Sequence, residues 1–144
     1  MNQLTFEVVF YPTYTRSMRS FIGLESVFLL RAEAKDVNPR FEIATKINGK
    51  SDPRFRSQQT IYCDDSEGGR KTPGKWYHIA IVYDGTKSST KEAYKMYING
   101  VRETLTPADN SYEDCAPNSS LNLTDVGGND KALMIGRSGA SYRV

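Results

Sequence analysis

Apolar and polar residues alternate along much of the chain, with the two-residue period that is typical of a β-strand buried on one face. In "LTFEVVFYP" the apolar residues Leu4, Phe6, Val8 and Phe10 fall on one face, and the predicted strand ends at Pro12. Further strands are predicted at residues 27–34 ("VFLLRAEA"), 40–47 ("RFEIATKI") and 59–63 ("QTIYC").

The longest alternating run is "GKWYHIAIVYDG", from Gly74 to Gly85, which contains the only Trp and the only His of the chain. Both faces of this run are largely apolar, which indicates a central strand covered on two sides. We expect Trp76 to pack in the core, because a large aromatic residue in an alternating run is usually buried. We expect His78 to be a hydrogen-bonded scaffold residue, since a catalytic base needs a partner acid or nucleophile that the sequence does not supply.

A hairpin is predicted in "AYKMYINGVRETL", where Asn99-Gly100 tolerates the positive φ angles of a tight turn. Tyr94, Met96 and Ile98 then share one face of its first strand. No segment shows a 3.6-residue apolar period, so helices should be few and short.

Residues 106–130 are polar and rich in Asn, Ser, Asp and Gly, and a loop of that length in a compact domain is usually functional or mobile. The last predicted strand follows at residues 131–137 ("KALMIGR"). Short strands separated by turn signals predict one all-β domain over residues 1–144, an antiparallel β-sandwich or jelly roll.

Composition excludes several classes of partner. The chain has 144 residues and a formal net charge of +2, with no run of Lys and Arg, which argues against a nucleic acid. No apolar run approaches 18 residues, so we expect no membrane insertion, and the N-terminus does not have the pattern of a signal peptide. Cys63 and Cys115 lack the spacing of a metal site; free thiols are favoured, and pairing is the alternative if the protein is exported.

The order of the motifs resembles the laminin-G-like, concanavalin A-like jelly-roll family. "LTFEVVFYPT", "KWYHIAIVYDG", "YKMYINGVRE" and "LMIGRS" are similar, in that order, to sequence signatures of this family. The resemblance covers nearly the whole chain. It implies a concanavalin A-like sandwich and, through "GLESVFLLR", a module of exported multidomain bacterial proteins.

Two departures from the family pattern suggest that the chain is a fragment. Family members usually begin one strand earlier and end with a further strand after the Ile-Gly motif, whereas this chain stops at "SGASYRV". We therefore expect a sandwich that lacks terminal strands, from a longer protein located outside the cell, on its surface or in the periplasm. A truncated edge would favour strand-mediated dimerisation.

The sequence does not predict an enzyme. Retaining glycoside hydrolases on this fold carry two carboxylates at alternate positions of one strand, about 5–5.5 Å apart. Glu7 and Glu42 each stand alone on a predicted strand, and the paired acids Asp64-Asp65 and Glu113-Asp114 fall in loops.

Two kinds of binding site are candidates. A sugar site needs aromatic faces and a few polar groups, and the proposed ligand-binding residues are Tyr14, Arg16, Asn110, Tyr112 and Asn129. A calcium site needs six to eight oxygen ligands, for which Asp125, Asn129 and Asp130 of "TDVGGND" are the candidates, although Asp and Asn also favour turns for backbone reasons.

The resemblance, rather than a visible site, implies the function. The first hypothesis is a noncatalytic carbohydrate-binding accessory module with a glycan partner. The second is a protein-interaction or spacer domain that uses the same fold and binds a cell-surface protein. Exposed aromatic residues gathered in one place would favour the first.

Overall fold

The structure, a computed structural model, describes residues 3–13, 20–24, 28–33, 38–45, 54–64, 71–87, 90–108 and 133–135. Its strands are β1 (Gln3–Phe10), β2 (Ser20–Leu24), β3 (Phe28–Glu33), β4 (Arg40–Thr45), β5 (Arg54–Thr60), β6 (Tyr77–Asp84), β7 (Tyr94–Ile98), β8 (Val101–Arg102), β9 (Thr106–Pro107) and β10 (Leu133–Ile135). One short helix, α1 (Thr90–Ala93), precedes β7. Within the described ranges, no helix has the length and apolar character needed to cross a membrane.

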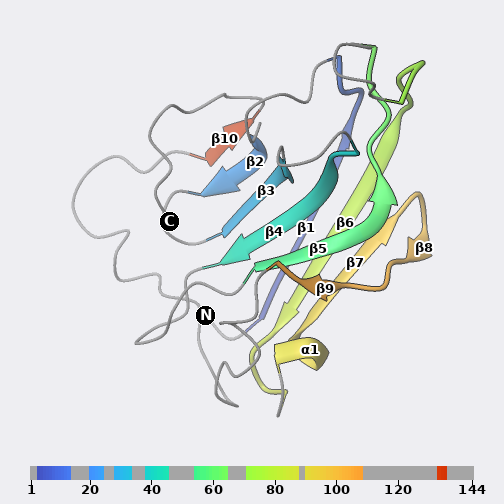
Figure 1. Ribbon diagram of the computed structural model, residues 1–144. Coiled ribbons are helices and arrows are strands. Elements are labelled where there is room, and N and C mark those ends of the chain that lie inside the picture. The colour runs from blue at the N-terminus through green and yellow to red at the C-terminus, as the bar shows by residue number, and fades with distance from the viewer. Residues whose placement is uncertain are drawn as a thin grey trace.

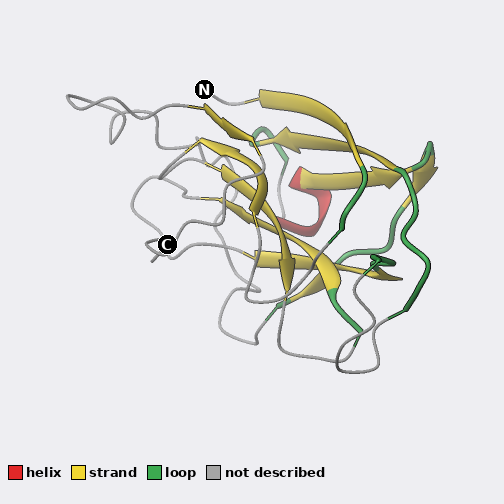
Figure 2. Cartoon of the chain, turned by 90° about the horizontal axis from the view of Figure 1, so that it is seen from above, coloured by secondary structure: helices red, strands yellow, loops and turns green. Residues whose placement is uncertain are grey.

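The strands form two antiparallel sheets that lie face to face (Figures 1 and 2). One sheet has the order β1-β6-β7-β8, and the other has the order β10-β2-β3-β4-β5-β9. Apolar residues from alternate positions of both sheets fill the space between them and form one core. This arrangement confirms the predicted antiparallel β-sandwich.

Alternation along the strands places the core residues as the sequence predicts. Every second residue of β1, from Leu4 to Phe10, is partly buried and packs against the core, while the residues between them are exposed. In β7, Tyr94, Met96 and Ile98 are buried. The predicted strands at 27–34, 40–47 and 131–137 are confirmed as β3, β4 and β10, each with shorter bounds.

The β7–β8 hairpin turns where it was predicted to turn. Asn99 and Gly100 have φ angles of 51° and 80°, the left-handed conformations that a two-residue hairpin requires. The Asn99 side chain also ties the turn to β6, because its Oδ1 accepts a hydrogen bond of 2.8 Å from the backbone N–H of His78. His78 Nε2 lies 3.2 Å from Glu7 Oε2 on the neighbouring strand, so the predicted hydrogen bond is present and its partner is an acid that the sequence analysis did not identify.

One sequence prediction about a strand is wrong, and a strand of the six-stranded sheet was not predicted. The strand predicted at 59–63 lies earlier, as β5, because Phe55 and Ser57 are the alternate residues that face the core. The other residues of β5 are polar or charged, so the segment contains too few apolar residues to be recognised as a strand from the sequence. The sequence analysis also did not predict β2.

The prediction that Trp76 packs in the core is also wrong. Strand β6 begins one residue later, at Tyr77, and 66% of the Trp76 surface is exposed. The expectation that β6 is covered on two sides also fails. Its core-facing residues are buried, whereas His78, Ala80 and Val82 on the opposite face are only partly buried.

The C-terminal end of β6 carries a carboxylate with a lowered pKa. Asp84 Oδ1 accepts hydrogen bonds from the Thr86 hydroxyl (2.6 Å), the Thr86 N–H (3.1 Å) and Gln3 Nε2 (3.2 Å). These bonds, that of the Thr86 hydroxyl foremost, stabilise the ionised form and lower the pKa of Asp84 from 3.8 to about 2.

This shift predicts a pH dependence of stability. Because the pKa is lower in the folded state, the contribution of Asp84 is complete above about pH 4 and is lost as the pH falls toward 2. We expect NMR titration of the Asp84 carboxyl carbon to give a midpoint near 2, and Thr86→Val to raise it. An Asp84 midpoint near 3.8 in the parent protein would contradict the hydrogen-bond assignment.

Candidate functional site

The proposed sugar and calcium ligands lie outside the described residues. They are Tyr14, Arg16, Asn110, Tyr112, Asp125, Asn129 and Asp130. Cys115 lies there too, so the relation between the two cysteines stays a prediction, while Cys63 is buried just after β5. Within the described part of the chain, no group of three or more His, Cys, Asp and Glu side chains is placed to hold a metal ion.

A different set of aromatic residues gathers at one end of the sandwich. The end of β1, the segment after β5 and the start of β6 meet there, at the top right of Figure 1. Trp76 is exposed, and its ring meets that of Tyr11 edge to face, with centroids 5.6 Å apart and planes at 61°. A third ring, Tyr62, carries the Lys75 ammonium 3.9 Å above its centroid.

Asp64 fixes the relative positions of these segments. Its Oδ1 accepts a hydrogen bond of 2.6 Å from the Tyr11 hydroxyl and one of 3.2 Å from the Gly74 N–H. The hydrogen bond to Asp64, with its negative charge, raises the pKa of Tyr11, so the phenol remains a donor at neutral pH. A Cβ on Gly74 would come within 2.7 Å of the Tyr11 hydroxyl, so only glycine permits this close approach.

The second tyrosine is also held in place through the backbone. The Tyr62 N–H donates a 2.7 Å hydrogen bond to the Tyr77 hydroxyl, and burial raises the pKa of Tyr77. Next to it, the Cys63 N–H donates a hydrogen bond of 3.1 Å to the Lys71 carbonyl and so joins these two segments. We call the set Tyr11, Tyr62, Asp64, Lys75 and Trp76 the aromatic rim.

The face of the six-stranded sheet that points away from the core carries charged residues beside Leu29 and Ala44. Alternation in β3, β4 and β5 points one set of residues into the core and the other set away from it. In the strand register, Arg31 lies opposite Glu42, which lies opposite Arg56, and Glu33 lies opposite Arg40. We call the charged residues of this face, Arg31, Glu33, Arg40, Glu42, Arg54 and Arg56, the charge ladder.

Ion pairs join the ladder across all three strands. Arg31 contacts Glu42 Oε1 through both Nε, at 2.8 Å, and Nη2. Arg56 reaches both acids, with Nη2 at 2.7 Å from Glu33 Oε1 and Nε at 3.5 Å from Glu42 Oε2. The side chains of Glu33 and Glu42 are each only 2% exposed, so these charges are paired in a largely water-excluded place.

The two ladder carboxylates contact arginines, which distinguishes them from the acid pair of a glycoside hydrolase. In a glycosidase pair, one carboxyl group must donate a proton to the leaving group and the other must reach the sugar ring or a water. Glu33 and Glu42 instead turn their oxygens toward arginine guanidinium groups. In the described part of the chain, both carboxylates are therefore engaged in ion pairs.

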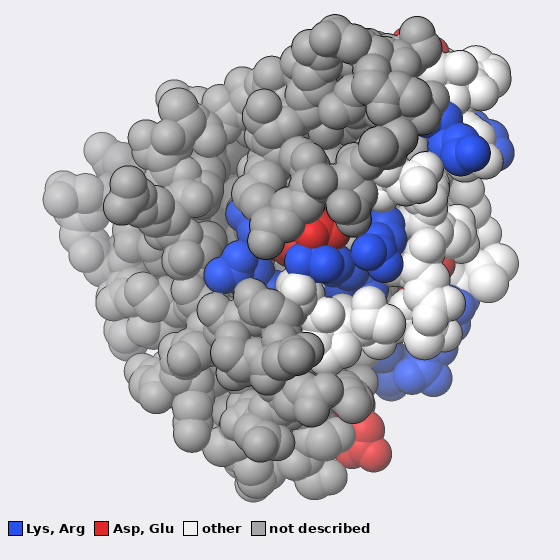
Figure 3. Space-filling view, in the orientation of Figure 1, with Lys and Arg blue, Asp and Glu red and all other residues white. Residues whose placement is uncertain are grey.

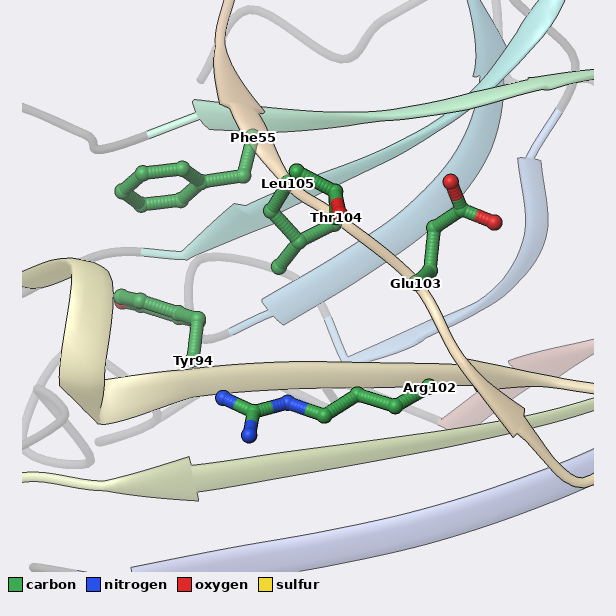
Figure 4. Close-up of a pocket in the computed structure, with 6 residues that line it drawn as sticks. All are labelled: Phe55, Tyr94, Arg102, Glu103, Thr104 and Leu105. Atoms are coloured by element: carbon green, nitrogen blue, oxygen red, sulfur yellow. The ribbon is translucent and has the colours of Figure 1, made fainter.

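A cavity of about 390 Å³ lies where residues 103–105 connect the two sheets (Figure 4). Its apolar wall consists of core residues, since Phe55 and Tyr94 are buried with ring centroids 5.0 Å apart. At its rim, Glu103 Oε1 already accepts a hydrogen bond of 3.0 Å from the Gln58 N–H. The cavity has the volume of a ligand pocket, and its described lining includes the polar residues Arg102, Glu103 and Thr104.

Sequence reasoning missed both the aromatic rim and the charge ladder. The rim brings together residues 11, 62, 64, 75 and 76, whose proximity depends on how three strand ends meet. The ladder had a visible signal, because "RAE" and "RFE" place charges at alternate positions of two consecutive strands. An antiparallel register for that pair would have put Arg31 opposite Glu42.

Comparison with curated proteins finds no match, and neither does comparison with solved structures. The sandwich of two antiparallel sheets is the fold that the sequence resemblance implies. A family model described as the Concanavalin A-like lectin/glucanases superfamily matches residues 2–142, so the chain belongs to this superfamily.

Proposed function

We propose that this domain is a noncatalytic carbohydrate-binding module that holds its glycan against the aromatic rim. The observation that carries the proposal is the exposure of Trp76, at 66%, beside the Tyr11 ring. An apolar indole face left in water is costly unless a partner covers it, and sugar rings present C–H surfaces that pack on aromatic faces.

The neighbouring polar groups suit the same ligand. Lys75 can donate to hydroxyl oxygens, and Asp64 can accept from hydroxyl groups through the oxygen that Tyr11 and Gly74 leave open. The contacts among Tyr11, Asp64 and Gly74 order these side chains before a ligand arrives, which lowers the entropy cost of binding. Membership in a superfamily of lectins and glucanases supports the proposal by analogy.

The single tryptophan allows a direct test. After a glycan array has identified a ligand, with calcium and with EDTA, we expect that ligand to change the fluorescence of the parent protein, whose only Trp is Trp76. Trp76→Ala should weaken binding by about tenfold or more, as for other central aromatic contacts. EDTA sensitivity would support the proposed calcium site at Asp125, Asn129 and Asp130.

A matched control removes an aromatic residue elsewhere. Tyr97→Ala, on β7 of the four-stranded sheet, should leave the affinity unchanged. A ligand that binds Trp76→Ala as tightly as the parent would overturn the site. A silent array on a folded sample would overturn the function and leave the protein-interaction hypothesis. As part of the same proposal, the domain is a module of an exported bacterial protein.

A further inference from the structure

The four-stranded sheet presents a row of unlike side chains on the face that points away from the core. Paired residues of neighbouring strands lie on the same face of a sheet, so the register places Ala80 on β6, Tyr97 on β7 and Arg102 on β8 in one outward row. In the next row, Lys95 lies opposite Val82. Arg102 is exposed, and the other four side chains are half-buried. We call these five residues the outer patch.

The central strand β6 is apolar on this outward side. An antiparallel sheet with one solvated face normally has polar residues on that face. Strand β6 departs from the pattern, because its outward positions between His78 and Asp84 are Ala80 and Val82. An apolar centre with a polar border is the usual composition of a surface that contacts another protein.

Two basic side chains border this apolar strip. Neither Lys95 nor Arg102 makes an ion pair with a described residue. The acids of the same face are engaged elsewhere, because Glu7 lies 3.2 Å from His78 and Asp84 accepts three hydrogen bonds at the end of β6. The outer patch therefore carries two positive charges, and its electrostatic complement is an acidic surface.

The six-stranded sheet shows the opposite arrangement of charge. Figure 3 shows basic and acidic atoms side by side over the middle of the face that Figure 1 presents, where the six-stranded sheet lies. There, the carboxylates of Glu33 and Glu42 contact arginine side chains of the same face. The two sheets thus differ, because only the charges of the charge ladder are paired within one sheet.

We propose that the outer patch is a docking site for an acidic segment of a protein partner, with Tyr97 at its centre. Tyr and Arg are over-represented among the residues that dominate the binding energy of protein interfaces. Tyr97 lies two residues from Lys95 along β7 and directly opposite Arg102. On its other side, Ala80 has a small side chain, which leaves room beside the ring for an apolar residue of the partner.

The shape of the sheet favours a protein over an oligosaccharide. Sites for small ligands are usually concave, whereas the outer patch lies on an open sheet face. Four strands at about 4.8 Å and six residues at about 3.3 Å give a face of roughly 20 Å by 20 Å, or about 400 Å². A standard interface buries about 800 Å² on each partner, so we expect weak binding that decreases as salt is added.

A second copy of this chain does not have the required charge. In a two-fold symmetric contact, the same patch meets itself. Lys95 and Arg102 would then lie against Lys95 and Arg102 of the other copy, and like charges repel. The partner is therefore a different protein surface, one that carries Asp or Glu.

This site goes beyond the proposed function and does not depend on it. Trp76 precedes β6, and Ala80 lies four residues further along the chain. Four extended residues span about 13 Å, so a short glycan at the aromatic rim and an acidic segment at the outer patch can bind together. Tyr97→Ala should weaken only the acidic segment, and Trp76→Ala only the glycan.

Selection of random twelve-residue peptides, displayed on phage, against the folded parent domain tests the proposal. We expect the enriched peptides to carry at least two Asp or Glu residues with an apolar residue between them. One enriched peptide is then synthesised, and its affinity is measured by fluorescence anisotropy at several salt concentrations. A peptide of twelve Glu residues is the matched probe, since it has the charge but no apolar residue.

Variants of the domain locate the bound peptide. Arg102→Glu reverses an exposed charge and should weaken binding about tenfold or more, and Tyr97→Ala should weaken it about tenfold. Ala80→Gln is neutral and fills the space beside Tyr97, so it should weaken binding severalfold. Lys71→Glu, at an exposed residue before β6, makes the same change in net charge as Arg102→Glu and should leave the affinity unchanged.

A charge exchange completes the test. With Lys in place of its acidic residues, the peptide should bind Arg102→Glu more tightly than it binds the parent. Enrichment of no peptide, or of peptides without acidic residues, would overturn the inference. So would full affinity in both Arg102→Glu and Tyr97→Ala, or equally tight binding of the twelve-Glu peptide. Displacement of the selected peptide by a tighter-binding chondroitin sulfate hexasaccharide would assign the patch to an anionic glycan and would also overturn it.

Discussion

The Glu42→Leu variant is expected to lose about 3–5 kcal/mol of unfolding free energy, which is the usual cost of removing one partner of a buried ion pair. Glu42 lies between Arg31, whose Nε is 2.8 Å away, and Arg56, and it is only 2% exposed. Without it, the Arg31 guanidinium remains buried with no carboxylate opposite it in the register. Urea unfolding followed by circular dichroism measures the loss.

A double-mutant cycle separates the pair from the two single side chains. Arg31→Met should also destabilise, because it removes the closest donor of Glu42. The double variant Arg31→Met, Glu42→Leu should be nearer to the parent than Glu42→Leu alone, since apolar replacement of a whole ion pair is often neutral. Arg56 retains Glu33 in that double variant, at 2.7 Å, so no buried charge is left without a partner.

An exposed pair provides the contrast. Glu7 and His78 lie 3.2 Å apart, but their side chains are 61% and 43% exposed. Glu7→Leu should therefore change the unfolding free energy by no more than about 1 kcal/mol. If Glu42→Leu proved as mild as Glu7→Leu, the charge ladder would not be the paired, water-excluded network that its geometry indicates.

The elements that sequence alone predicted are those whose signal is local. Strand β1 alternates without interruption from Leu4 to Phe10, and the turn at Asn99-Gly100 needs only two residues that tolerate positive φ. Such patterns are complete within ten residues, so no knowledge of a partner strand is needed. The fold class followed from several of them in succession.

The parts that sequence missed depend on which strands are neighbours. The β5 residues that point away from the core are charged or polar. Their place in a strand is explained only by the register, in which Arg56 lies opposite Glu42. Trp76 shows the same limit of prediction from a local sequence pattern. Its place in an alternating run suggested burial, but it precedes the first paired residue of β6, Tyr77, which lies opposite Phe10.

Phe41, by contrast, is where the two sheets share one aromatic cluster. Its side chain on β4 is fully buried. Its ring centroid lies 5.0 Å from that of Tyr77 on β6, 6.0 Å from that of Phe10 on β1 and 5.8 Å from that of Phe21 on β2. Two of these contacts cross between the sheets, so the ring contributes to the packing of one sheet on the other.

Phe41→Ala should therefore lower the unfolding free energy by about 3–5 kcal/mol, through lost burial and the cavity that it leaves. Trp76→Ala removes a larger ring that is 66% exposed, and it should change stability by no more than about 0.5 kcal/mol. Urea unfolding of the two variants side by side distinguishes a core ring from a ligand-facing one. If Trp76→Ala destabilised the protein as strongly as Phe41→Ala, Trp76 would be a core residue, and the aromatic rim could not present it to a glycan.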